Sequence, residues 1–306
     1  MKNIKNFLLV LLLTSSTFSI AQRQVERNLI LHPLNDTTKT FNGKRVSFAH
    51  NFAAFASFGK FVAIKDDDHE WYQQIGSLME LMRFRNNATL VVVSHMQLFA
   101  DPNNNINLNP RAIFWEEGLF YSWQGKSRYY KAGYYHRCKH DVDNLTIGEE
   151  RGLIFGSFLF ETIIPVALRN DNLMLAFRND LYTIRQDFRI PRHSEGQLPN
   201  LDRILTTFRG NFHYQKLFFS QLGLYINGYT ALNIYSKNEG LLDRFTNLHS
   251  TNLSAGLSSG LVLKGNAQIR LGFNYEYLTD SNIGIPLQPT HLLSFGIMGI
   301  SPFAIR

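Results

Sequence analysis

The densest reactive chemistry lies near the middle of the chain, where an imidazole and the only thiol stand two residues apart, at His136 and Cys138. A thiol beside an imidazole is a pairing found in nucleophilic acyl-transfer sites, because the thiolate is the attacking form. Two other interpretations are open. The histidines could bind a metal ion with nearby carboxylates, or they could be interfacial residues beside a solvated acidic loop. The metal interpretation adds His140, Asp141 and Asp143.

The element that must position this pair is a β-strand, in which alternate residues share a face. One face of the predicted strand 128–140 carries three cations, Lys131, Arg137 and Lys139. Three long cations are not compatible with hydrocarbon, so that face should line a polar interior. His136 and Cys138 are then expected to point outward, toward lipid.

The same two-residue period recurs along the chain and is clearest near its C-terminal end. Every odd-numbered residue from Ile269 to Tyr277 is aliphatic or aromatic, and the even-numbered ones between them are polar or glycine, including Arg270 and Glu276. The segment 206–215 repeats the pattern. A soluble β-sandwich would bury these charges in its core, whereas a membrane barrel accepts them in a polar interior.

This period predicts an all-β protein, a transmembrane antiparallel β-barrel of about 12 strands. The predicted strands are 46–64, 71–85, 89–100, 111–124, 128–140, 152–165, 172–186, 204–215, 217–234, 252–263, 267–279 and 291–303. Short connections alternate with longer polar ones along this series, as in outer-membrane barrels, whose short turns lie in the periplasm. Closure is required because an open sheet edge in lipid leaves backbone groups unsatisfied.

The N-terminus has the layout of a secretory signal peptide, with two lysines, a short apolar run and small residues before an expected cut after Ala21. The expected organisation is a signal peptide at 1–21, an N-terminal periplasmic segment at 22–45 and the β-barrel at 46–306. The expected location is the cell outer membrane.

Composition excludes several other classes. The formal net charge is +7, but no basic run of the kind that binds nucleic acid is present. A single cysteine allows no internal disulfide and no paired-cysteine metal motif. The chain also lacks a phosphate-binding glycine loop, so no cofactor is expected. The expected partners are outer-membrane lipids and lipopolysaccharide, and the oligomeric state stays open.

Two adjacent carboxylates, Glu116 and Glu117, interrupt an otherwise aromatic predicted strand. Neighbouring residues of a strand point to opposite faces, so one of the two must face outward unless a bulge intervenes. A carboxylate in the lumen is expected to pair with a cation such as Lys131 or Arg178 in a structural network.

The spacing of His136 and Cys138 resembles a motif of the outer-membrane phospholipase A family, a twelve-stranded barrel, and of the unrelated lipid A deacylases. Those proteins carry a His-x-Ser pair on the lipid-facing side of a strand, with a hydrogen-bonding or acidic partner about a dozen residues on. The resemblance implies His136 as general base, Cys138 as nucleophile in place of serine and Glu150 as the group that orients the imidazole. It extends to uncharacterised outer-membrane barrels that have a His-x-Ser-x-His run before an acidic loop.

A twelve-stranded lumen crowded with arginine, tyrosine, glutamate and histidine is expected to be narrow or plugged, which disfavours a general porin. The sequence therefore predicts an integral outer-membrane barrel of undetermined cargo. The alternative is an outer-membrane lipid acyl hydrolase, of the phospholipase A or lipid A deacylase type, that uses His136 and Cys138. A soluble periplasmic β-protein is a third hypothesis.

Overall fold

The computed structural model describes residues 46–48, 52–62, 69–84, 88–100, 110–142, 150–168, 171–190, 204–236, 245, 248–278 and 290–301. The predicted signal peptide and the segment 22–45 lie outside the described residues. Among the residues that the structure describes, no helix is long and apolar enough to cross a membrane.

The described chain is built from antiparallel β-strands. They are β1 (Val46–Phe48), β2 (Phe52–Phe61), β3 (Trp71–Phe84), β4 (Ala88–Ala100), β5 (Pro110–Gln124), β6 (Tyr129–Asp141), β7 (Glu150–Leu168), β8 (Asp171–Ile190), β9 (Ile204–Leu217), β10 (Leu222–Ser236), β11 (Leu248–Lys264), β12 (Gln268–Leu278) and β13 (Thr290–Ile300).

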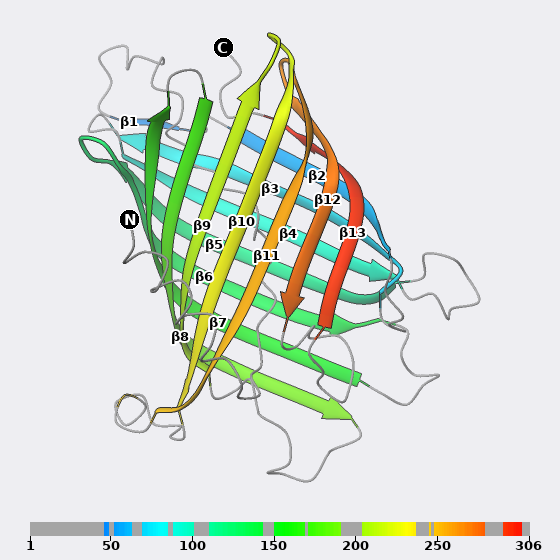
Figure 1. Ribbon diagram of the computed structural model, residues 1–306. Coiled ribbons are helices and arrows are strands. Elements are labelled where there is room, and N and C mark those ends of the chain that lie inside the picture. The colour runs from blue at the N-terminus through cyan, green and yellow to red at the C-terminus, as the bar shows by residue number, and fades with distance from the viewer. Residues whose placement is uncertain are drawn as a thin grey trace, which may run out of the picture.

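Strands β2 to β13 form a closed cylinder, because each pairs with the next in sequence and β13 pairs back onto β2. The short β1 pairs with the end of β3 beyond β2, with Val46 opposite Phe84, so β1 and β2 share one position in the wall. The predicted fold, an antiparallel barrel of about twelve strands, is confirmed. In Figure 1 the front strands β10 to β12 cross the rear strands β4 to β6 steeply, as the tilted walls of a barrel do.

Several strand boundaries differ from the prediction by a few residues, and two of the differences change an element. Within the range of the first predicted strand, 46–64, the structure has two strands, β1 and β2. The turn predicted at 215–216 lies instead between Leu217 and Leu222, where Phe219 is strongly exposed. Phe218 and Phe219 fit the pattern of a strand, but both lie in the β9–β10 turn, outside the paired strands. The predicted alternation of short and long connections is otherwise confirmed.

Alternate residues separate into a polar interior and an apolar exterior. On β12, Arg270 and Glu276 are buried inside the barrel, while the odd-numbered residues Ile269, Leu271 and Phe273 are exposed outside. The other strands alternate in a similar way, so the wall presents many large apolar side chains outward. This inversion of a soluble protein's pattern is the architecture of outer-membrane barrels.

The core of the fold is therefore the lumen. At the end of the long connections, an apolar cluster of Phe61, Phe99, Phe114, Leu278 and Leu292 joins side chains from β2, β4, β5, β12 and β13. A second cluster lies among β7 to β10 and includes Phe155 and Tyr182. Ionised and polar side chains fill much of the interior beyond these clusters.

Candidate functional site

A β-bulge in β3 places two charged residues on the same interior face. Glu80 and Arg83 are three residues apart and would normally face opposite sides, but the register against β4 shifts between Glu80 and Met82. Both side chains are consequently buried. The guanidinium of Arg83 donates to both carboxylate oxygens of Glu80, from Nε at 2.6 Å and Nη2 at 2.7 Å.

A second ionic cluster crosses the interior between β5 and β8. Arg137 donates from Nε to Glu116 at 2.5 Å, and its Nη2 lies 3.5 Å from Oδ1 of Asp180. Arg178 binds both oxygens of Asp180 at 2.8 Å. Both guanidiniums lie over the ring of Tyr135. A planar guanidinium can donate two hydrogen bonds to one carboxylate and stack on an aromatic ring, and a lysine ammonium cannot replace it in this geometry.

The interior around this cluster is closed to solvent. The exposed fractions of Asp180, Glu116 and Arg137 are 0%, 1% and 4%. Lys131 pairs with Glu161 at 2.8 Å, and both are buried. The expectation that lumen carboxylates form a structural network is confirmed in kind, with Glu116 bound to Arg137.

On the outer side of β6, His136 and Cys138 are partly exposed, while Lys131, Arg137 and Lys139 are buried inside. The predicted assignment of the two faces is therefore confirmed. Cys138 lies directly opposite Trp115 of β5 and Ile154 of β7.

The neighbour of His136 across the β5–β6 ladder is Glu117, which is exposed on the same outer face. Directly opposed residues have Cβ atoms about 4.5–5.5 Å apart, within reach of a carboxylate–imidazole contact. Glu116 faces inward and Glu117 outward, so the two adjacent carboxylates divide as expected. The sequence indicated that one of the two carboxylates must face outward. It did not indicate that Glu117 lies opposite His136, because that pairing depends on the strand register, which no local pattern gives.

Glu150 lies elsewhere. It is the first residue of β7, and the β7 residue opposite His136 is Gly156, six positions further along. At about 3.3 Å per residue, this separates Glu150 from the level of His136 by roughly 20 Å along the strand. The strand register therefore makes Glu117 and Cys138 neighbours of His136 on the outer face, whereas Glu150 lies far along β7 from them.

Tyr134 borders the site on its other side. Its ring crosses Gly156, and its hydroxyl lies 2.9 Å from the hydroxyl of Thr183 on β8. A Cβ on residue 156 would collide with that tyrosine hydroxyl, so the close approach requires glycine. His136 is thus flanked by Glu117 and by the Tyr134–Thr183 bridge.

The metal interpretation receives no set of ligands from the described residues. Among them, no group of three or more histidine, cysteine, aspartate or glutamate side chains is placed to hold an ion. Asp141 points inside and pairs with Lys139, whereas His140 is exposed outside and packs edge-on against Trp115. Asp143 lies outside the described residues.

No protein-family model matches the chain, and neither does any curated protein sequence. Among solved structures, the chain is similar to LpxR from Salmonella typhimurium, at 9% identity and a TM-score of 0.45 over 80% of this chain and 99% of that one. It is also similar to the KdgM porin, at 8% identity and a TM-score of 0.39 over 83% of this chain and 99% of that one. A third similar structure is the transport unit of the autotransporter AIDA-I from Escherichia coli, at 10% identity and a TM-score of 0.42 over 88% of this chain and 94% of that one. At these values the likeness concerns the barrel architecture and says nothing about cargo or activity.

Proposed function

We propose that this protein is an integral outer-membrane barrel whose lumen is sealed by its own side chains and which works at its outer, lipid-facing surface. The buried ionic cluster carries the proposal, because Asp180, Glu116 and Arg137 have almost no solvent contact in mid-barrel. A conducting lumen requires hydrated wall residues. The apolar exterior supports membrane insertion, since a soluble protein rarely exposes so large an apolar surface.

The test of this proposal combines location with conductance. The full chain is expected in the outer-membrane fraction, and the purified barrel in planar bilayers is expected to add no steady current above the bare membrane. A pore-forming porin in the same membranes is the positive control. Recovery in the soluble periplasmic fraction, or stable open channels from the parent chain, would overturn the proposal.

A second candidate function, lipid acyl hydrolysis, is favoured by the register of Glu117 against His136. An ionisable carboxylate on the lipid-facing wall is unfavourable and has no role in closing the barrel. Beside an imidazole and a thiol it supplies the third member of a nucleophile, base and orienting acid. We assign these roles to Cys138, His136 and Glu117, with Glu117 in place of Glu150.

The chemistry would follow the usual two steps of covalent acyl transfer. His136 accepts the Cys138 proton, the thiolate attacks the ester carbonyl, and the alcohol leaves with the proton that the imidazolium returns. Water, deprotonated by His136, then attacks the thioester, so the fatty acid leaves and the thiol is restored. The carboxylate of Glu117 stabilises the imidazolium in both steps.

The height of the site in the wall suits an ester at a membrane surface. Cys138 is nine residues along β6 from Tyr129, which begins the strand at the short β5–β6 turn. A rise of about 3.3 Å per residue and a tilt of about 40° place it roughly 23 Å from that end. The apolar band of such barrels is about 25 Å tall, so the thiol lies near its far edge.

Matched variants test this candidate. Release of fatty acid from phospholipid or lipid A in mixed micelles is expected from the parent and to fall by about 10²-fold or more in Cys138→Ala and His136→Ala. Glu117→Gln is expected to slow the reaction, while Glu150→Gln leaves it unchanged. If both alanine variants match the parent, catalysis at this site is refuted; if Glu150→Gln is the damaging one, the carboxylate is misassigned.

A further inference from the structure

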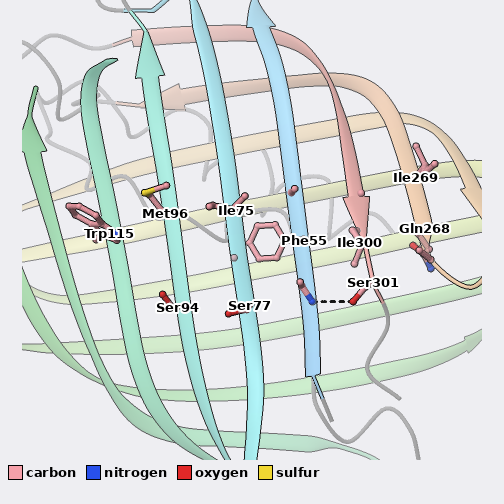
Figure 2. A pocket seen from close by; sticks show the side chains of 15 residues that line it. Phe55, Ile75, Ser77, Ser94, Met96, Trp115, Gln268, Ile269, Ile300 and Ser301 are labelled. Carbon is pink, nitrogen blue, oxygen red and sulfur yellow. Dashed lines mark hydrogen bonds between the residues drawn. The ribbon is translucent and has the colours of Figure 1, made fainter. Parts of the chain in front are cut away.

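An open groove crosses the outer wall of the barrel from β12 and β13 to β5 and encloses about 670 Å³. Figure 2 shows Gln268 and Ser301 at one end and Trp115 at the other. Its side chains on the outer face are small along one line and bulky beside it. The outward-facing lining includes Ala54, Ser77, Ser94, Ile75, Met96 and Trp115.

The groove leads to the candidate catalytic residues. In the strand register, Ala54 pairs with Ser77, Ser77 with Ser94, Ser94 with Glu117, and Glu117 with His136. Directly paired residues lie side by side across a sheet. The row of small residues in the groove ends at Ser94, and the next two strands place the carboxylate and then the imidazole in the same row.

Two ridges flank this floor. On one side, two residues from the floor on each strand, the register joins Ile75, Met96, Trp115 and Cys138. The opposite ridge joins Met79, Val92, Leu119 and Tyr134. The first of these rows lines the groove through Ile75, Met96 and Trp115, and the second row lies on the other side of the alanine and serine floor. Cys138 continues the first row on β6, directly opposite Trp115.

We propose that this groove holds one acyl chain of a membrane lipid, lying from the Gln268–Ser301 end toward Glu117. The occupant follows from the surroundings, because the neighbouring outward side chains, among them Phe58, Ile75 and Ile297, are exposed and apolar. On such a surface the molecule in contact is a lipid tail. Four strand spacings from β2 to β6 give about 19 Å, and one leaflet of a ~30 Å hydrocarbon core takes about 15 Å, so a tilted chain fits.

This inference rests on the proposed membrane insertion and not on catalysis by Cys138. If the hydrolase proposal holds as well, the bound chain belongs to the ester that the thiol attacks, and the substrate class is a long-chain acyl lipid. If it fails, the groove remains a site for a retained structural lipid. Binding and turnover are therefore measured separately.

The experiment measures lipid retained by the full-length barrel. The chain is reconstituted in vesicles of phosphatidylethanolamine and phosphatidylglycerol with palmitoyl and oleoyl chains and extracted in mild detergent. Native mass spectrometry then measures the mass of the protein with any lipid still bound. The Cys138→Ala variant, which cannot turn the lipid over through this thiol, is the background for all comparisons. It is expected to retain lipid at one strong site.

Two groove-filling variants and one matched control decide the outcome. Ser94→Phe and Ser77→Phe fill the floor on different strands, and Ser259→Phe adds the same side chain to an exposed outward serine of β11, away from the groove. Retention is expected to fall at least about tenfold, or about 1.4 kcal/mol, in the groove variants and to stay unchanged in the control. Resistance of the folded barrel to protease identifies which variants are folded.

Equal retention in a folded groove variant and in Ser259→Phe, or no retention in the Cys138→Ala background, would overturn the proposal. A parent dimer that Ser94→Phe converts to monomer without any change in lipid would also overturn it, since the occupant would then be a second copy. Failure of every chain to enter the vesicles would instead refute the membrane insertion on which the inference rests.

Discussion

Replacing Asp180 by asparagine tests directly whether the lumen is sealed. The carboxylate has no solvent exposure and accepts two hydrogen bonds of 2.8 Å from Arg178, with Nη2 of Arg137 3.5 Å away. Asparagine keeps the shape but removes the charge, so the Arg178 guanidinium is left in a dry interior without its counter-ion. Breaking a buried ion pair from one side costs about 3–5 kcal/mol, and we expect a loss in that range.

A second ion pair of the same barrel provides the control. Lys60 and Glu70 are 2.8 Å apart, but their side chains are 45% and 31% exposed. Solvent screens such a pair, so Glu70→Gln is expected to cost at most about 1 kcal/mol. The assay is urea unfolding of the parent and both variants in lipid vesicles, followed by tryptophan fluorescence.

The double variant Arg178→Met with Asp180→Leu provides a further check. Apolar side chains of similar volume often replace a buried ion pair with little loss, so this variant should be more stable than Asp180→Asn alone. The reasoning is refuted if Asp180→Asn and Glu70→Gln shift unfolding equally. A hydrated interior would then surround Asp180, and the argument against a conducting lumen would fail with it.

Two further predictions concern the wall of the barrel. Deleting Leu81 removes the extra residue of the β3 bulge and keeps Arg83 on the inner face, so the barrel should still fold. Deleting Val92 from β4, which has no bulge there, moves every later residue of that strand to the opposite face. This control deletion should abolish the protease-resistant barrel. Gly156→Val should displace the Tyr134 hydroxyl from its bridge and lower the urea midpoint by the equivalent of about 1 kcal/mol or more, whereas a midpoint equal to the parent would mean that the bridge contributes nothing.

The sequence predicts the wall of this barrel well because each strand meets one apolar and one aqueous environment. Arg270 inside and Phe273 outside follow from a period of two alone. Prediction fails where the chain leaves the ladder. Phe218 and Phe219 satisfy the composition of a strand, and only the register of β9 against β10, with Gly223 opposite Leu217, identifies them as the turn.

The candidate site was predictable in part. The outward direction of His136 and Cys138 follows from the cations that alternate with them, so it is a local property. Their third partner is not, because it comes from another strand. Chain distance led to Glu150, about a dozen residues on, whereas the β5–β6 register places Glu117 beside the imidazole. Cross-strand pairing joins residues that have no fixed spacing in sequence.

Glu116 and Glu117 show most directly why we propose that this protein works at its outer surface. Glu116 is bound by Arg137 in the interior, so its charge is compensated and its presence is accounted for by the stability of the fold. Glu117 faces the apolar exterior, where a carboxylate does not contribute to barrel closure and an apolar residue would be more favourable. Its position opposite His136 and beside the end of the groove is the basis of the catalytic role that we propose for that charge. If Glu117→Leu gave a more stable barrel with undiminished lipid hydrolysis and lipid retention, that role would be disproved.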